Sequence, residues 1–380
     1  MNEKISAFLS ERIAANDFPS AVYLVAEKGE IVFHDVLGNA VVTPEVIPAR
    51  LDTIYDLASL TKPLVTGLLA AQQLENGNIE LGWTTDHYFE EFRTPVALEG
   101  AWDTSIDELV SHRTLFQAWK PFHLFVNSRA EILEEIVRTP MNLEGPHVLY
   151  SDLNFLILMF LLERLGGAKI DRLAEERILK PLDLSNSFFN PAAGFRRRIA
   201  GSEKGNEYER IMCIEKGYLQ PPATAGGTDR GSVFRDYQIW GEVHDGNAYF
   251  MGGVAGHAGL FSTAEQVFKI ALQFLPQYTT LLRPETCELF RTNFTKGMNE
   301  DRSFAFQLAS TEGSTAGTKM SPESFGHNGF TGTSLWIDPV KDRIFVLLTN
   351  RTHNHPLPFV NINSVRRRFH DIAIEELERN

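Results

Sequence analysis

A serine and a lysine three residues apart, Ser59 and Lys62, are the first residues in the chain whose types and spacing suggest chemistry. Residues at this spacing share a helix face, so the Lys62 amine can reach the Ser59 hydroxyl. Pro63 indicates a helix start, because proline is tolerated only in a first turn. A buried lysine with a lowered pKa can activate a serine nucleophile. An isolated match also fits a serine-capped helix with a solvated lysine.

Two later segments strengthen the prediction of nucleophilic catalysis. Tyr150-Ser151-Asp152 precedes an apolar stretch that ends at Gly166-Gly167, which is typical of a buried helix. Gly326-His327-Asn328-Gly329-Phe330 leads into a β-rich run at residues 334–337. The chain therefore offers a hydroxyl, an amine and a phenol, each at the boundary of a predicted element.

With these three segments in this order, the sequence resembles the superfamily of serine β-lactamases, penicillin-binding proteins, D-alanyl-D-alanine carboxypeptidases and esterases. That superfamily orders its site as Ser-x-x-Lys, Tyr-x-Asn, and Lys-Thr-Gly or His-x-Gly on an edge strand. The resemblance covers most of the chain, including residues 105–113, 243–263 and 336–339. It implies an α/β fold of the β-lactamase and transpeptidase type, with a helix-flanked antiparallel sheet and a mostly helical second lobe.

The resemblance assigns a role to each residue of the pattern. Ser59 would be the nucleophile, while Lys62 and Tyr150 would share proton transfer. The backbone N–H groups of Ser59 and Phe330 would form an oxyanion hole. The alternative for Tyr150 is a core aromatic residue with a satisfied hydroxyl.

Asp152 departs from the pattern, because the superfamily has asparagine there. A carboxylate near Lys62 would favour the charged ammonium and shift the role of base toward Tyr150. Alternatively, Asp152 or Ser151 mainly caps the helix that follows.

His327 is a second departure, since β-lactamases mostly carry lysine at this position. A histidine removes a fixed positive charge that would hold a substrate carboxylate. By resemblance His327 and Gly329 would line the substrate side of the edge strand, and a structural strand histidine is the alternative. This pattern is nearer to carboxypeptidases and esterases than to resistance enzymes.

The implied reaction is hydrolysis through an acyl-enzyme on Ser59, with no cofactor. The substrate would be a small molecule or peptide with an ester, amide or β-lactam carbonyl. The segment from Gly252 to Thr263 is most similar to that of low-molecular-mass penicillin-binding proteins, which favours a D-alanyl peptide, with an esterase second. A β-lactamase, or a penicillin-binding sensor that acylates without efficient turnover, are the alternatives.

Both ends of the chain supply the predicted strands that must position these residues. The sequence predicts an opening hairpin at 21–26 and 31–34, strands at 334–337 and 344–348, and a last helix from about 363 to 378. Helix signals dominate the middle, with capping boxes at Ser105 and Ser128. We therefore expect an α/β lobe from residues 1–81 and 246–380, and an inserted helical lobe from residues 82–245. Residues 192–246 lack periodicity and predict surface loops.

Composition excludes several function classes. The 380 residues include 36 Lys and Arg against 49 Asp and Glu, a net charge of −13 that disfavours nucleic acid. No segment approaches the ~18 apolar residues of a membrane span. The N-terminus lacks a signal-peptide pattern, which predicts a cytoplasmic protein, or a periplasmic or secreted one if a leader has been removed.

The remaining candidate residues receive structural interpretations. Cys213 and Cys287 fit buried thiols rather than a disulfide framework or zinc site. The histidines in 353–355 and the pair at 244–245 lack the spacing of a metalloenzyme motif, so no metal is expected. The arginine run 366–368 predicts a solvated helix face.

Overall fold

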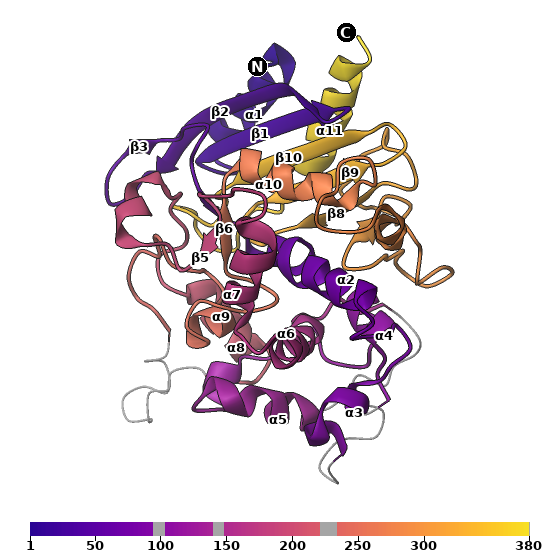
Figure 1. Cartoon of the computed structure of the whole chain (residues 1–380). Coiled ribbons are helices and arrows are strands. Elements are labelled where there is room, and N and C mark those ends of the chain that lie inside the picture. Colours follow the sequence, from indigo (N-terminus) through magenta and orange to yellow (C-terminus); the bar gives the residue numbers. More distant parts are fainter. Residues whose placement is uncertain (94–102, 140–147, 221–233, 380) are drawn as a thin grey trace, which may run out of the picture.

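The structure is a computed structural model that describes residues 1–93, 103–139, 148–220 and 234–379. A seven-stranded antiparallel sheet forms its upper part in Figure 1. Its strand order is β3-β2-β1-β10-β9-β8-β7. The strands are β1 Ser20–Glu27, β2 Glu30–Val41, β3 Ile47–Pro48, β7 Gln307–Leu308, β8 Phe325–Asn328, β9 Ser334–Asp338 and β10 Arg343–Thr349. Both ends of the chain therefore build one sheet, which confirms the predicted α/β fold class.

The central strand β1 explains why helices cover both faces of this sheet. Side chains alternate between the faces of a strand, and every β1 residue except Glu27 is buried. Val22 and Leu24 belong to the core that contains α2 (Leu68–Glu75) and α10 (Ala264–Ala271). Tyr23 and Val25 belong to a second core with α1 (Glu3–Ala14) and α11 (Asn363–Leu377), and Figure 1 shows these helices together near the two termini.

The predicted opening hairpin is confirmed. β1 and β2 pair antiparallel across the two-residue turn Lys28-Gly29. Both turn residues have positive φ, at 54° and 77°, which is the geometry that matches the twist of paired strands. The strands at the other end and the last helix are confirmed as β9, β10 and α11.

The regular elements in the middle of the chain are mainly helices, and they lie largely in the lower half of Figure 1. A small sheet, in the order β4-β6-β5, joins this region to the Ser59 segment. The elements are α3 Thr85–Tyr88, α4 Ile106–Ser111, α5 Ile132–Val137, α6 Asp152–Gly166, α7 Ile170–Ala174, α8 Glu207–Glu215, α9 Gly246–Phe250, β4 Tyr55–Asp56, β5 Phe188–Phe189 and β6 Leu260–Ser262. The lobe boundaries at residues 81 and 245 stay predictions.

The interpretation of residues 192–246 as surface loops is wrong for α8. This helix buries Glu209 and Cys213, four positions apart, instead of an apolar stripe. A helix that buries a carboxyl group and a thiol gives little hydrophobic periodicity, so the sequence pattern missed it. Residues 221–233 of the same segment lie outside the described residues.

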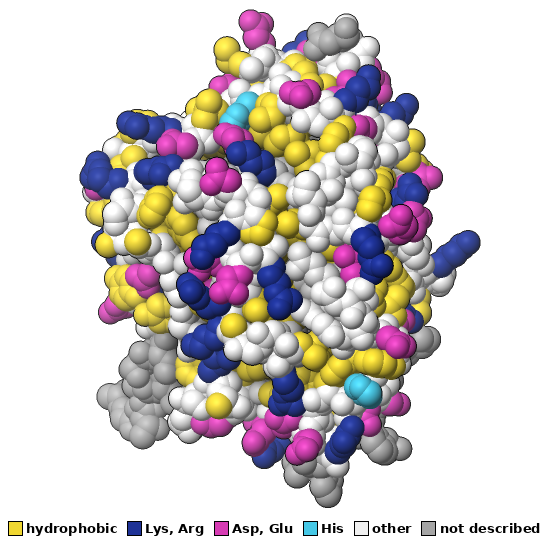
Figure 2. All heavy atoms as spheres, in the orientation of Figure 1, with side chains coloured by type: hydrophobic (Ala, Val, Ile, Leu, Met, Phe, Trp, Pro, Cys, Tyr) yellow, Lys and Arg dark blue, Asp and Glu magenta, His cyan; other side chains and the backbone are white. Residues whose placement is uncertain are grey.

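The surface carries interspersed charge on the face seen in Figure 2, where Lys and Arg side chains alternate with Asp and Glu. Among the described residues, no helix has the length and apolarity needed to cross a membrane.

Candidate active site

Ser59 lies in a tight turn directly after β4. The preceding residue, Ala58, has φ of 48°, a left-handed conformation that is uncommon for residues other than glycine. Asp56 supports this turn, because its carboxylate accepts hydrogen bonds from the N–H of Ala58 (2.9 Å) and of His244 (2.8 Å). Such strain persists only where surrounding contacts maintain it, and it is frequent at functional sites.

The helix start predicted at Ser59 is confirmed in an irregular form. Ala58–Leu60 form a 3-10 turn, Lys62–Gly67 form a π-helical segment, and α2 follows. Short π-helical segments are rare and occur mostly at functional sites. This irregular helix start places the Lys62 side chain within hydrogen-bonding distance of Ser59 Oγ.

The Lys62 ammonium connects the segments of the site. Lys62 is fully buried, and its Nζ donates to Ser59 Oγ at 2.9 Å and to the carbonyl oxygen of His257 at 3.3 Å. The same Nζ lies 2.7 Å from Asp152 Oδ1 and 4.8 Å from the centroid of the Tyr150 ring. The serine, amine and phenol therefore meet in space as the sequence predicts.

Lys62 and Tyr150 both hold their protons in this arrangement. Burial lowers the pKa of Lys62, but Asp152 and Tyr150 outweigh burial and raise that pKa above its ordinary value. The lowered lysine pKa that burial alone predicts is therefore not found, and the expectation that a carboxylate at Asp152 favours the charged ammonium is confirmed. Burial also raises the pKa of Tyr150, although Lys62 and Ser59 oppose this effect.

The contacts at the start of α6 show which residue caps this helix and which residue contacts Lys62. Ser151 is the N-cap, and its hydroxyl accepts a hydrogen bond from the N–H of Leu153 at 3.2 Å. Asp152 is the first helical residue, and its carboxylate is directed to Lys62.

His112 is a neighbour of the site that the motif reasoning missed. It follows α4 with φ of 59°, and its ring lies 4.6 Å from the Tyr150 ring. Its Nδ1 accepts a hydrogen bond from the N–H of Ser151 at 3.0 Å. Burial, and then Arg302 and Lys62, hold the pKa of His112 well below its usual range, so the ring is neutral. Only the family likeness of residues 105–113 pointed to this position.

His327 lies on β8 with its ring 5.7 Å from that of Tyr150. Its Nδ1 is 2.9 Å from the carbonyl oxygen of Asn328, which can only accept, so Nδ1 carries the proton. Burial, Lys62 and Arg302 hold the pKa of His327 well below its usual range. The histidine is therefore a neutral group and not a replacement for the lysine charge.

The loop after β8 is hydrogen-bonded to the turn that contains Ser59. Thr331 Oγ1 donates to the carbonyl of Asp56 at 2.7 Å, and Thr333 Oγ1 donates to that of Leu57 at 2.9 Å. A Cβ at Gly329 would lie 2.5 Å from the Leu57 oxygen, so only glycine allows this close approach.

Arg366 also forms hydrogen bonds with this loop. It is buried on α11, and its Nη2 donates to the carbonyls of Gly329 (2.9 Å) and Thr333 (3.0 Å). The prediction of a solvated cation is therefore wrong for Arg366. Among the described residues, no acceptor binds the N–H of Phe330, the group that the family pattern assigns to an oxyanion.

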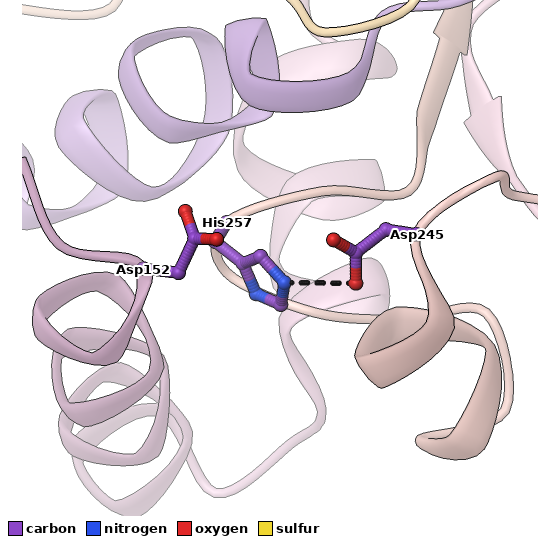
Figure 3. Close-up of side chains that lie close together, drawn as sticks. All are labelled: Asp152, Asp245 and His257. Carbon is purple, nitrogen blue, oxygen red and sulfur yellow. Dashed lines mark hydrogen bonds and ion pairs between the residues drawn. The ribbon is translucent and has the colours of Figure 1, made fainter. Parts of the chain in front are cut away.

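Asp152, Asp245 and His257 form a cluster from three separate elements (Figure 3). One ligand atom of each lies within 4.8 Å of the others, and His257 Nε2 is 3.0 Å from Asp245 Oδ1. Geometry alone would permit a metal ion here. The Lys62 ammonium already pairs with Asp152 and would repel a second cation, so these residues fit an ion-pair network better than a metal site.

A cavity of about 500 Å³ opens beside Ser59. Every predicted site residue except the fully buried Lys62 lines it, namely Ser59, Tyr150, Asp152, His327, Gly329 and Phe330. Its volume is within the range of small-molecule sites.

Together, the helix-flanked antiparallel sheet and the cavity at its edge define the fold of β-lactamases and penicillin-binding proteins. The chain belongs to the β-lactamase family, whose profile matches residues 5–366. This family consists of serine hydrolases that act on carbonyl substrates.

Individual relatives agree with this assignment. A putative D-alanyl-D-alanine carboxypeptidase of Escherichia coli (strain K12) is 29% identical over 361 residues, which cover 89% of this chain and 79% of that protein. The structure of EstCE1, a hydrolase with promiscuous acyltransferase activity, has a TM-score of 0.71 at 18% identity and covers 97% of this chain and 98% of its own. A class C β-lactamase from Rhodobacter sphaeroides has a TM-score of 0.69 at 16% identity, with 99% of each chain covered.

Proposed function

We propose that this chain hydrolyses its substrates through an acyl-enzyme on Ser59, and that D-alanyl peptides are its preferred substrate class. The observation that carries the proposal is the 2.9 Å hydrogen bond from Lys62 Nζ to Ser59 Oγ at the wall of the cavity. The name of the Escherichia coli relative supports the substrate class.

In the reactive form Tyr150 has lost its own proton to solvent. Ser59 Oγ then attacks the carbonyl carbon, and the serine proton passes to the Tyr150 phenolate beside the Lys62 ammonium. The N–H groups of Ser59 and Phe330 stabilise the oxyanion. The pair then returns the proton to the leaving amine or alcohol. A water molecule finally attacks the acyl-enzyme, which releases the acid and restores the Ser59 hydroxyl.

Tyr150 is the better immediate proton acceptor of the pair. Asp152 holds Lys62 as an ammonium, so the amine is not available as a base in the resting site. The Tyr150 phenolate that must exist before attack is stabilised by the adjacent Lys62 charge, which opposes the rise that burial causes in the pKa of the phenol.

The position and charge of Arg302 favour a substrate that carries a free carboxylate. It lines the cavity with its guanidinium 5.3 Å from the Tyr150 ring, and its Nη2 pairs with Glu300 at 2.8 Å. Its Nη1 is buried without a hydrogen-bond partner among the described residues. This charge can take the role of the lysine that His327 replaces, as a D-alanyl terminus requires.

A simple esterase is the second candidate. The neutral His327 and the fold shared with EstCE1 favour it. Turnover of D-alanyl peptides should be compared with that of p-nitrophenyl acetate, together with mass spectrometry after addition of a labelled penicillin. Release of D-alanine supports the peptidase, and turnover of the ester alone supports the esterase.

The same assay separates the remaining alternatives. A stable adduct on Ser59 without turnover indicates a penicillin-binding sensor, and hydrolysed penicillin indicates a β-lactamase. If no serine-directed reagent labels Ser59, the acyl-enzyme proposal is wrong.

A further inference from the structure

Glu209 lines the same cavity as Ser59, but the proposed reaction gives it no role. It lies in the first turn of α8 and is only 6% exposed. Tyr208 and Met212 of the same helix also line the cavity, so α8 forms part of the wall.

The Glu209 carboxyl group has no cationic partner among the described residues. Its Oε1 has no side-chain hydrogen-bond partner, and the donors to the carboxyl group among the described residues are uncharged: Asn206 Nδ2, at a long 3.4 Å from Oε2, and the backbone N–H of Gly246. His123 Nδ1 is 3.9 Å from Oε1, but burial lowers the pKa of His123 and leaves that ring neutral. Arg235 directs its guanidinium to the Asn206 side chain and to two backbone carbonyls instead.

The carboxylates around Glu209 have partners of their own. Glu203 lies 2.7 Å from His244 Nε2, and Asp245 lies 3.0 Å from His257 Nε2 (Figure 3). Burial, followed by Asp245 and Glu203, raises the pKa of Glu209 to about 8, with Arg235 opposing the rise. An unpaired buried acid is costly, and such groups in clefts are frequent at functional sites.

We propose that Glu209 is a binding subsite for a primary ammonium group of the substrate. The ammonium would pair with the carboxylate while Ser59 attacks a carbonyl in the same cavity, so this inference rests on the proposed function. An ammonium fits better than a metal ion, because no group of three possible ligands among the described residues includes Glu209. The net charge of −13 also attracts cations to the protein.

The substrate class that follows is an acyl compound or peptide that carries both charges. Arg302 offers a guanidinium for a carboxylate, and Glu209 offers a carboxylate for an ammonium, within one cavity. A peptide with a free amine would find a partner for each of its charged groups.

Matched esters test the subsite directly. A series of p-nitrophenyl ω-aminoacyl esters with three to six carbons would be compared with the corresponding acetamido esters, which differ in charge. At pH 8.5, above the pKa of Glu209 and below that of an alkylammonium group, we expect the wild type to prefer the best amino ester by at least about tenfold in kcat/KM, since a hydrogen bond to a charged group is worth about 1.5–3 kcal/mol. Glu209→Gln should reduce this preference to about one.

Glu207→Gln is the matched control, because Glu207 lies in the same turn of α8 but is partly exposed and pairs with Arg210. It should keep the preference. Equal kcat/KM for amino and acetamido esters at every length in the wild type would overturn the subsite and leave the proposed function standing. Failure of the wild type to turn over any ester or peptide would overturn the proposed function instead.

A second measurement needs no variant and applies if Glu209→Gln does not fold. Pentylammonium should inhibit wild-type hydrolysis of p-nitrophenyl acetate more strongly than pentanol does, by at least about tenfold in inhibition constant. Equal inhibition by the two compounds would count against the subsite.

Discussion

The Lys62 ammonium lies 2.7 Å from a carboxylate oxygen of Asp152, at the position where the family pattern has asparagine. This pair changes the electrostatics of the site, because a carboxylate at this distance keeps the lysine protonated. The base that accepts the serine proton must therefore be sought among the neighbours of Lys62, and Tyr150 is the nearest phenol.

Replacement of the nucleophile should abolish acylation, and replacement of the phenol should slow it. Ser59→Ala should abolish labelling by penicillin or by a serine-directed phosphonate. Tyr150→Phe should slow acylation by about 10²–10⁴, the usual contribution of a positioned acid or base. Stopped-flow release of p-nitrophenol measures the acylation rate, and wild-type rates in both variants would exclude these roles.

Asp152→Asn should shift the rising limb of the pH–rate profile to lower pH. Asp152 raises the pKa values of both Lys62 and Tyr150, so its loss lowers both. A group that acts in its deprotonated form then becomes active at lower pH, by about one pH unit or more. The profile of kcat/KM for p-nitrophenyl acetate tests this, and an unmoved limb would show that neither group limits the rate.

Arg302→Gln should weaken binding of substrates that end in a free carboxylate. The loss of a charge-assisted hydrogen bond predicts a rise of about tenfold or more in KM for a D-alanyl peptide. The same peptide with an amidated C-terminus is the matched control, and its KM should not change between wild type and variant. A similar rise for both peptides would indicate a general distortion of the cavity.

Gly329→Ala should impair catalysis by separating the two halves of the candidate oxyanion site. Its new Cβ would overlap the Leu57 carbonyl and push the Phe330 loop away from Ser59. Loss of one oxyanion donor predicts a decrease in kcat of about 10²–10³. Gly82→Ala is the control, because a Cβ there meets no atom within 4 Å. Equal kcat values in the two variants would contradict the assigned role of the loop.

The sequence alone predicted the parts of this protein that depend on local pattern. Ser59 and Lys62 could be paired because three-residue spacing places both on one helical face, and Pro63 located the start of that helix. Two β-rich runs joined by a short connection that contains Gly29 predicted the hairpin of β1 and β2, and the Gly166-Gly167 pair predicted the end of α6. The family likeness then supplied Tyr150 and the residues 327–330.

The tertiary structure decided which charges meet. The contact of Lys62 with the His257 carbonyl joins residues 195 positions apart, and no local period encodes such a contact. The same holds for the contact of Asp152 with Lys62, which raises the lysine pKa, and for the contact of Arg366 with the Gly329 loop. The desolvation and pairing of a charge depend on all the elements around it, so these properties arise only when distant segments pack together.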